Sequence, residues 1–526
     1  MKKSLVLALI VCPSFSGWAQ EKQWYLEDPA KDSVQGLSVE TAYETLLKGR
    51  TSAPVLVAVI DSGIDIEHED LKDVIWTNPK EIAGNGKDDD NNGYIDDVHG
   101  WNFIGGAKGN VGDDSSELTR EYARLSKVFE PYADRKVPGR LKKEHAYYQV
   151  IKNKYESQNK DNAGKLKMYS GVYKQFSLGL DSVKKILGKD SVSREDLKSI
   201  KSTNPIVLFS QMLVLNQPED SSPDEMKTGL KEAVDHFEGA VKGMDTSFDP
   251  RPIVGDNYGD TDERLYGNTD VIGPDPSHGT HVAGIIAANR KNDVGVKGIA
   301  DNVRIMVVRA VPNGDERDKD VANAIRYATD NGARVINMSF GKSYSPQKEA
   351  VDKAVKYAEK KGVLLVHAAG NEGQDNDKSS NFPSPFFLNK KEAKNWIEVG
   401  ASGPDVNSLA ASFSNYGKKS VSLFSPGVRI YSTLPKNKYG FNDGTSMASP
   451  ATAGVAALVM SYFPQLTAVQ VKDILLRSSR KFHNLPSGKE NLPGKNFSDL
   501  SVAGGLVNAY EALKLAASES LQLKAK

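Results

Sequence analysis

The chain has 526 residues, of which 39% are hydrophobic and 26% are charged, and its formal net charge is zero. This composition is typical of a soluble globular protein with one large domain and insertions, or with two to three ordinary domains. Because a neutral chain has no overall field, we expect neither nucleic acid nor an anionic membrane surface as a partner.

The N-terminus has the pattern of a cleavable export signal. Two lysines precede an apolar run at residues 5–11, and small residues stand at positions 17 and 19. We therefore predict a signal peptide over residues 1–19 and an extracytoplasmic location, either periplasmic or secreted. The apolar run is too short to span a bilayer and no later segment reaches about 18 uninterrupted apolar residues, so we expect no integral membrane association. The single cysteine, Cys12, lies within this signal, which excludes disulfide bonds from the predicted mature chain.

The remaining chain divides into tracts of different character. Residues 20–112 contain the continuous apolar run 55–60, which is typical of a strand covered on both faces. Residues 113–260 are rich in Lys, Glu and Ser and carry apolar residues at helical spacing, so we expect a helical insertion. Residues 261–516 alternate short apolar runs with amphipathic stretches, and a tail follows at 517–526. This alternation predicts the α/β fold class, with a doubly wound, mostly parallel sheet and helices on both faces.

Three segments place reactive side chains at the ends of these predicted elements. The apolar run ends in Asp61, a Ser-His-Gly-Thr-His segment places His278 at the start of a helix, and a Gly-Thr-Ser-Met-Ala segment places Ser446 at the start of another. In open α/β sheets such groups gather at the carboxyl ends of the strands. A serine hydroxyl becomes a nucleophile when a neighbouring base takes its proton, and a carboxylate orients that base. Asp61, His278 and Ser446 could supply these three groups.

Each segment taken alone also has an ordinary structural explanation. An Asp-Ser-Gly sequence is usually a turn, and a Gly-Thr-Ser sequence can simply cap a helix. His278 and His281 have the spacing of two metal ligands, but no clear third ligand accompanies them. The combination of all three segments in one chain favours catalysis.

The three segments resemble the Asp, His and Ser signatures of the subtilisin family of serine peptidases, and they follow that family's chain order. Further similarity lies at residues 367–373, 432–435 and 437–440, and the resemblance covers residues 50–75 and 261–515, about half of the chain. It implies a subtilisin-like fold with a large insertion between the Asp and His signatures. It also implies a serine-type endopeptidase that hydrolyses proteins or peptides, although exopeptidase action stays open.

The resemblance implies a role for each residue of the site. Ser446 attacks the scissile carbonyl, His278 takes and returns the proton, and Asp61 orients the imidazole. The Asn371 side-chain amide and the Ser446 backbone N–H hold the oxyanion. Two walls hold the substrate as an added strand, and they are formed by Ser339, Phe340 and Gly341 and by Ala368, Ala369 and Gly370.

The stretch before the Asp signature departs from the family pattern. About 40 residues separate Ala19 from Asp61, which leaves no room for the usual folding propeptide. We therefore expect this stretch to belong to the mature domain.

An acidic segment of the first tract resembles the start of an EF-hand calcium loop. Oxygen ligands stand at alternate positions around a glycine, and the candidates are Asp88, Asp90, Asn92, the Tyr94 carbonyl and Asp96. The twelfth position holds His99 instead of glutamate, so Asp97 or a distant acid must complete the shell. The alternative is a solvated acidic turn without a cation. The family resemblance places a second Ca²⁺ site at Asp70 and Asn292, and we expect calcium to have a structural role.

Two other classes of function stay open. A subtilisin-shaped chain could be an inactive binding module that engages a partner through the helical insertion, although all four catalytic positions are filled. The acyl-enzyme could also pass its acyl group to an amine, which would make the chain a transpeptidase or a cyclase.

Overall fold

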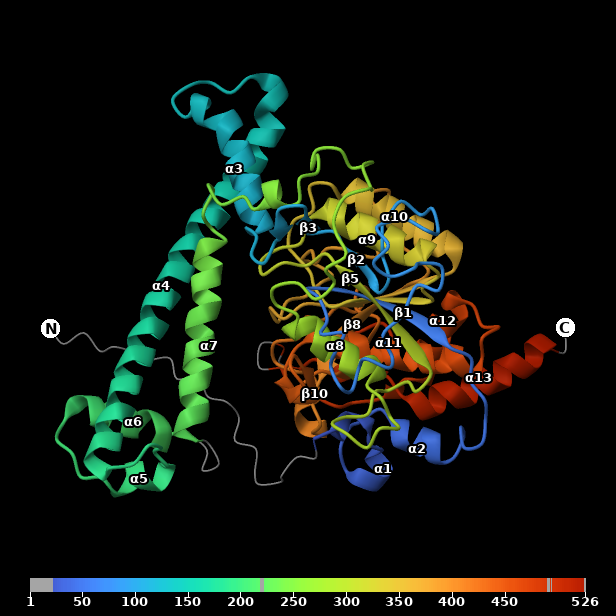
Figure 1. The fold of residues 1–526 in the computed structure, drawn as a ribbon. Helices are drawn as coiled ribbons and strands as arrows, with labels where there is room; N and C mark the ends of the chain where they lie inside the picture. Colours follow the sequence, from blue (N-terminus) through green and yellow to red (C-terminus); the bar gives the residue numbers. More distant parts are fainter. Residues whose placement is uncertain (1–21, 218–221, 490–491, 493, 525–526) are drawn as a thin grey trace. The chain divides into compact units, whose positions relative to one another are not determined.

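The computed structural model describes residues 22–217, 222–489, 492 and 494–524 (Figure 1). The predicted signal peptide at residues 1–19 lies outside the described residues. The chain forms two compact units. We call residues 153–244 the helical unit, and we call residues 22–152 together with the residues from 245 onwards the α/β unit. The helical unit is narrower than the tract at 113–260 that the sequence marks as an insertion.

The α/β unit is built on a nine-stranded sheet with the strand order β12-β13-β9-β8-β7-β6-β1-β5-β2. All neighbouring strands are parallel except β12 and β13, which pair antiparallel. The strands are β1 (Val55–Asp61), β2 (Gly100–Asn102), β5 (Val303–Arg309), β6 (Val335–Met338), β7 (Leu364–Ala368), β8 (Trp396–Ser402), β9 (Leu423–Pro426), β12 (Arg480–Lys481) and β13 (Gly505–Leu506). Two antiparallel hairpins lie outside the sheet, β3 (Gly105–Gly106) with β4 (Gly109–Asn110) and β10 (Ile430–Leu434) with β11 (Lys438–Asn442).

Helices cover both faces of this sheet. Helices α8, α11, α12 and α13 lie on one face, and α9 and α10 lie on the other (Figure 1). Their side chains pack in two separate cores, one on each face. The bounds are α8 (Ser277–Ala287), α9 (Asp318–Asp330), α10 (Lys348–Lys361), α11 (Thr445–Tyr462), α12 (Ala468–Ser478) and α13 (Ala509–Lys524). In the interior strand β1, Val57 and Val59 join the first core, whereas Ala58 and Ile60 join the second. Successive side chains of a strand point to opposite faces, which explains why the run 55–60 is apolar throughout. The doubly wound, mostly parallel fold predicted from the sequence is confirmed.

The residues before β1 pack into the α/β unit. They form η1 (Trp24–Leu26), α1 (Pro29–Asp32) and α2 (Val39–Glu44). Trp24 and Tyr25 are fully buried in the core that contains α8 and α11. Trp24 Nε1 also donates a hydrogen bond to the Val428 carbonyl at 3.2 Å. This stretch is an integral part of the α/β fold.

The helical unit has a small core of its own. It contains most of α4 (Lys142–Leu187), with α5 (Arg194–Ser199), α6 (Pro205–Leu215) and α7 (Pro223–Lys242). Phe176 and Leu180 of α4 pack with Val207 of α6 in this core. Tyr155 Oη donates to the Met244 carbonyl at 2.7 Å, so the two ends of the unit lie side by side. Among all the described helices, none is apolar over a length that would cross a bilayer.

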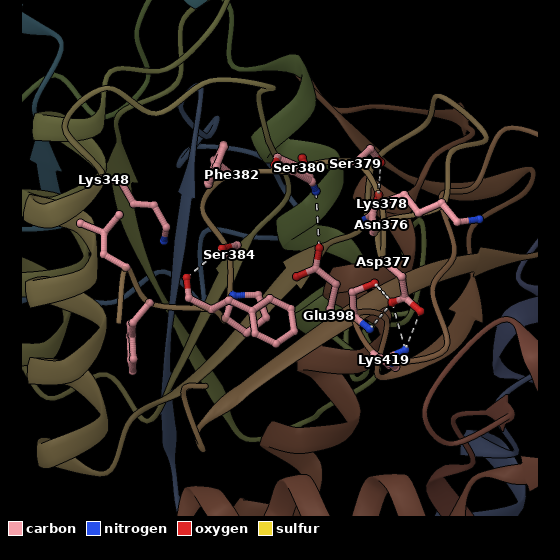
Figure 2. A pocket seen from close by; sticks show the side chains of 16 residues that line it. Lys348, Asn376, Asp377, Lys378, Ser379, Ser380, Phe382, Ser384, Glu398 and Lys419 are labelled. Atoms are coloured by element: carbon pink, nitrogen blue, oxygen red, sulfur yellow. Dashed lines mark hydrogen bonds between the residues drawn. The ribbon is translucent and has the colours of Figure 1, made fainter. Parts of the chain in front are cut away.

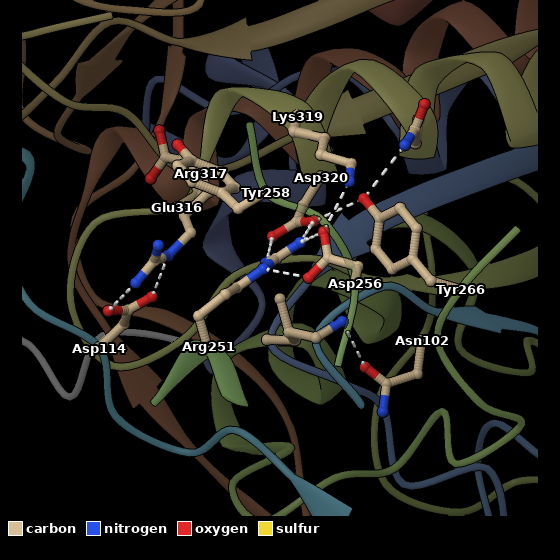
Figure 3. A network of polar contacts seen from close by, with 12 residues as sticks. Asn102, Asp114, Arg251, Asp256, Tyr258, Tyr266, Glu316, Arg317, Lys319 and Asp320 are labelled. Atoms are coloured by element: carbon tan, nitrogen blue, oxygen red, sulfur yellow. Dashed lines mark hydrogen bonds and ion pairs between the residues drawn. The ribbon is translucent and has the colours of Figure 1, made fainter. Parts of the chain in front are cut away.

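Buried ion pairs tie the segments that flank the helical unit to the start of α9 within the α/β unit (Figure 3). Arg251 lies between two carboxylates: its Nη2 is 2.8 Å from Asp320 Oδ1, and its Nε is 2.6 Å from Asp256 Oδ1. Arg317, just before α9, places Nε 2.7 Å from Asp114 Oδ2. Buried charges are costly unless they are paired, so these contacts specify how residues 113–120 and 249–256 pack on the fold.

Candidate active site

The three predicted catalytic residues lie where the sheet meets two helices. Asp61 is the last residue of β1, which lies between β5 and β6 in the sheet. His278 and Ser446 are the second residues of α8 and α11. Both helices contact β1 and also contact each other. The fold therefore gathers these three residues from distant parts of the chain at one region of the sheet edge.

Asp61 and His278 are joined by a short hydrogen bond. His278 Nδ1 lies 2.7 Å from Asp61 Oδ1, which also accepts the Ser62 backbone N–H at 2.8 Å. Asp61 is buried, whereas the His278 side chain is 39% exposed. Burial alone would lower the pKa of His278, but the Asp61 carboxylate more than offsets this effect and raises the pKa above its usual value. The contact orients the ring, with Nδ1 protonated and Nε2 left as the basic nitrogen.

Hydrogen bonds fix the first turn of α11 around Ser446. Ser339 Oγ donates to the Ser446 carbonyl at 2.9 Å, and Asn337 Nδ2 donates to Ser339 Oγ at 2.9 Å. Ser449 Oγ donates in turn to Asn337 Oδ1 at 2.8 Å. In the described part of the chain, the Ser446 hydroxyl makes no hydrogen bond to His278. Contacts of this kind often tighten only when substrate is bound.

Asn371 follows β7 and faces the start of α11. Its Oδ1 accepts the backbone N–H of Thr445 at 2.9 Å and the Thr445 hydroxyl at 3.0 Å, which turns its Nδ2 away from that residue. A side-chain carbon at Gly444 would lie 3.6 Å from Asn371 Nδ2 and 3.5 Å from the Ser446 backbone nitrogen. The two nitrogens therefore flank one small space beside the serine. Gly444 keeps this space open, and its φ of 152° is a value that other residues rarely adopt.

The two predicted substrate walls leave the same edge of the sheet side by side. Residues 339–341 follow β6. Residue 368 is the last residue of the neighbouring parallel strand β7, and residues 369 and 370 follow it. In the second wall the carbonyls of residues 368–370 already accept hydrogen bonds from Asn381, Asn376 and Asn415. In the first wall the main-chain groups of Phe340 and Gly341 have no hydrogen bond to any residue that the structure describes. Only the first wall therefore offers groups with which an extended peptide could pair.

A buried lysine anchors the first wall to α3 (Glu117–Phe129). Lys342 directly follows Gly341, and its Nζ lies 2.7 Å from Glu117 Oε2 and 2.9 Å from Asp318 Oδ1. All three charged side chains are buried. Burial alone would raise the pKa of Glu117, but Lys342 and Arg120 lower it to about 2. Sequence reasoning missed this contact because its members lie far apart and form no motif.

The acidic segment at residues 88–97 folds into tight turns that use several of the predicted calcium ligands. Asp88 and Asp96 each accept two backbone N–H groups from neighbouring turn residues. Asn92 Oδ1 accepts the backbone N–H of Tyr94 at 2.8 Å. Of the five predicted ligands, only Asp90 lies in a cluster of carboxylates within the described residues.

Asp90 forms this cluster with Glu81 and Asp97, and one oxygen of each lies within 4.8 Å of the others. Glu81 Oε2 is buried and has no hydrogen-bond partner among the described residues. Burial raises the pKa of Asp97 to about 6. A buried carboxylate oxygen without a donor, beside two further carboxylates, fits a hard cation. Sequence reasoning named Asp97 as a completing ligand but missed Glu81, which lies outside the EF-hand spacing.

Asp70 and Asn292, the predicted second calcium site, are brought together in a different way. Asn292 Nδ2 donates to Asp70 Oδ1 at 2.8 Å, and the Val296 backbone N–H donates to Oδ2 at 2.9 Å. Burial raises the pKa of Asp70. The structure brings the two predicted ligands together, and a Ca²⁺ site there stays a prediction.

Comparison with known proteins places this fold and site in a family. The model described as the subtilase family matches residues 52–499, which is most of the chain. The chain belongs to the subtilase family. This subtilase is 46% identical over 186 residues to the thermophilic serine proteinase of Bacillus sp. (strain AK1), a match that covers 35% of this chain and 43% of that protein.

The match with this chain covers a larger share of two further relatives. The subtilase is 41% identical to subtilisin DY of Bacillus licheniformis, over 40% of this chain and 70% of the relative. It is 35% identical to thermitase of Thermoactinomyces vulgaris, over 50% of this chain and 85% of the relative. With this family membership and these relatives, the chain is a subtilisin-like serine protease.

Proposed function

We propose that this subtilase is an exported serine peptidase that hydrolyses peptide bonds through Asp61, His278 and Ser446. The observation that carries the proposal is the 2.7 Å hydrogen bond between the Asp61 carboxylate and the His278 ring, next to the helix whose second residue is Ser446. A buried carboxylate that raises the pKa of a partly exposed imidazole creates the general base that a serine hydroxyl needs.

The catalytic cycle proceeds through an acyl-enzyme. His278 Nε2 takes the Ser446 proton as Ser446 Oγ bonds to the scissile carbonyl carbon, and the carbonyl π electrons move to oxygen. The tetrahedral intermediate collapses, the carbon–nitrogen bond breaks, and the His278 proton passes to the leaving amine. Water then attacks the ester with His278 again as base, which releases the acid and restores Ser446. Asp61 stabilises the imidazolium during both halves of the cycle.

The oxyanion of the intermediate binds in the space beside Gly444. The Asn371 side-chain amide and the Ser446 backbone N–H flank that space. Because Asn371 Oδ1 is held by Thr445, its Nδ2 is oriented before the substrate arrives. Donors that are oriented in advance need no reorganisation as charge develops, and the N-terminus of α11 adds a favourable dipole.

The substrate is a peptide or an extended segment of a protein. Phe340 and Gly341 offer main-chain groups that are open to pairing, so the peptide adds as a strand along residues 339–341. Residues 368–370 line the opposite side of the substrate by packing contacts alone, since their carbonyls already accept hydrogen bonds within the protein.

We also propose a structural Ca²⁺ ion at the cluster of Glu81, Asp90 and Asp97. The support is the buried Glu81 Oε2 without a donor, together with the closeness of the three carboxylates. A hard cation there would relieve the repulsion between the carboxylates and hold the turns at residues 85–97 against the sheet. The ion takes no part in the steps above.

Export rests on the pattern of residues 1–19. N-terminal sequencing of the protein recovered from outside the cytoplasm should begin at Gln20. Recovery of an active protein that retains residues 1–19 would contradict the proposed cleavage.

Mass spectrometry of the products of an unfolded protein substrate tests the activity. The wild type should release internal peptides with free carboxyl termini, and Ser446→Ala should release none at equal protein concentration. A correctly folded wild type that binds the substrate without cleaving it would instead favour the inactive binding module. Products joined head to tail would indicate transpeptidation.

A further inference from the structure

A buried histidine–glutamate pair that the catalytic cycle does not use lies beneath the substrate walls. His367 of β7 and Glu398 of β8 are partners in the parallel register, and both are almost fully buried. His367 Nδ1 lies 3.0 Å from Glu398 Oε2, and Trp396 Nε1 donates to the same oxygen at 2.8 Å. The His367 ring meets the ring of wall residue Phe340 edge-on, with 6.2 Å between the centroids.

Asn381 connects this pair to both walls. Its Nδ2 donates to the Ala368 carbonyl of the second wall at 2.9 Å. On the first wall, a side-chain carbon at Gly341 would lie 2.4 Å from Asn381 Oδ1. The neighbouring residue Phe382 exchanges two main-chain hydrogen bonds of 2.9 Å with Lys342, which holds this segment against the end of the first wall. The Asn381 side chain therefore closes the gap between the walls as a floor.

The floor is electronegative. Asn381 Nδ2 also lies 3.4 Å from Glu398 Oε1, so the Glu398 carboxylate is directly behind it. His367 Nε2 is buried and finds no partner among the described residues, so a second proton on the ring would leave a donor unsatisfied. The Glu398 carboxyl group accepts hydrogen bonds from Trp396 and Asn381 and lies against His367 Nδ1. Within the described residues, no lysine or arginine forms an ion pair with Glu398.

Asn381 also borders a cavity that residues 339–341 and 368–370 do not line. A cavity of about 550 Å³ is lined by Asn381 and Glu398 together with the loop at residues 376–388. Figure 2 shows Glu398 pointing from the sheet toward the part of this loop that carries Ser380. Of the three lysines that line the cavity, Lys348 is paired with Asp352 and Lys378 with Asp375, whereas Lys419 forms no ion pair with any described residue. A long side chain that enters between the walls would thus meet an amide oxygen first and a buried carboxylate behind it.

We propose that Asn381 and Glu398 form the floor of the pocket that receives the residue whose carbonyl Ser446 attacks, and that this floor selects a lysine or arginine side chain. We call this substrate position the acyl-side residue. A cationic head group supplies a donor to Asn381 Oδ1, and the Glu398 carboxylate behind Asn381 attracts its positive charge. An aliphatic side chain of equal length would leave Asn381 Oδ1 without a partner. The inference rests on the proposed peptidase function.

Matched fluorogenic peptides that differ only at the acyl-side residue test the inference. Lysine is compared with norleucine, which has the same chain without the ammonium group, and with phenylalanine. For the wild type, kcat/KM should be at least about tenfold higher for lysine than for norleucine. Glu398→Gln should lower this ratio about tenfold. Asp377→Asn is the matched control because Asp377 lines the same cavity without contacting the floor, and it should keep the wild-type ratio.

Because Glu398 is buried, a second variant tests the pocket floor at a residue that is less buried. Asn381→Leu fills the floor with an apolar side chain at a partly buried site, and it should reverse the preference toward norleucine or phenylalanine. Equal cleavage of lysine and norleucine peptides by the wild type, or an unchanged ratio in both floor variants, would overturn the inference. A wild type that reacts at Ser446 with a serine-reactive fluorophosphonate but prefers phenylalanine as the acyl-side residue overturns only this inference. A wild type that cleaves no peptide overturns the proposed function as well.

Discussion

The charge of Asp61 determines the pH range in which His278 can act as a base. Because the carboxylate raises the pKa of His278, the ring stays protonated to a higher pH than an isolated histidine would. Only the neutral ring accepts the Ser446 proton, so kcat/KM should fall as the pH drops through a midpoint above about 6.5. Asp61→Asn should shift this midpoint down and lower kcat by about 10⁴-fold. An activity that is constant between pH 5 and 8 would show that His278 is not the base.

Asn371 contributes through one amide group, and its effect should appear in kcat. Asn371→Ala removes one of the two oxyanion donors and should lower kcat by about 10²–10³-fold with little change in KM. Thr445→Val keeps that donor but removes the hydroxyl that helps to orient it, so its loss should be smaller. Steady-state kinetics on one peptide substrate measures the fall in kcat of both variants. A fall in kcat for Asn371→Ala no larger than that for Thr445→Val would contradict the oxyanion role.

At the scale of elements, the contact between α3 and the first substrate wall is a buried ion pair. Glu117→Gln would leave the Lys342 ammonium buried without its closest charge, and it should destabilise the α/β unit by about 3–5 kcal/mol. Because the pKa of Glu117 is lowered to about 2, its stabilising contribution is complete above about pH 4.5 and is lost as the pH falls toward 2.

Urea unfolding followed by tryptophan fluorescence measures this effect, since residues 153–244 contain no tryptophan. Glu511→Gln removes one partner of an exposed pair with Lys514 in α13 of the α/β unit and serves as the control, and its stability should change by less than about 0.5 kcal/mol. Equal stabilities of the two variants at pH 7 would mean that the Glu117–Lys342 contact does not anchor the wall.

The sheet could be predicted from the sequence because its strands are buried on both faces. Residues 55–60 are apolar at every position, and that run ends at the aspartate that contacts His278. The bond between Asn337 and Ser449 could not be predicted, since two small polar residues on separate elements carry no periodic signal. Glu81 was missed for a related reason: the fold of the turns, and not the spacing of ligands along the chain, brings it to Asp90 and Asp97.

At the scale of the whole molecule, the catalytic groups and the proposed calcium cluster belong to the α/β unit. Removal of divalent ions by a chelator should lower the melting temperature of that unit by a few degrees, and added Ca²⁺ should restore it by mass action. Glu81→Gln should abolish this response, whereas Glu349→Gln, at an exposed position of α10, should keep it. A wild-type melting temperature that is the same with chelator and with Ca²⁺ would rule out the site.

Labelling with a serine-reactive fluorophosphonate tests the central claim most directly, because the probe reacts with a serine only when a base has activated it. Peptide mapping of the labelled wild type should find a single phosphonylated residue, Ser446. The rate should fall sharply in His278→Ala, and the label should be absent in Ser446→Ala. Failure of a correctly folded wild type to react, or a label on a different serine, would contradict the assignment of Asp61, His278 and Ser446 as one catalytic group.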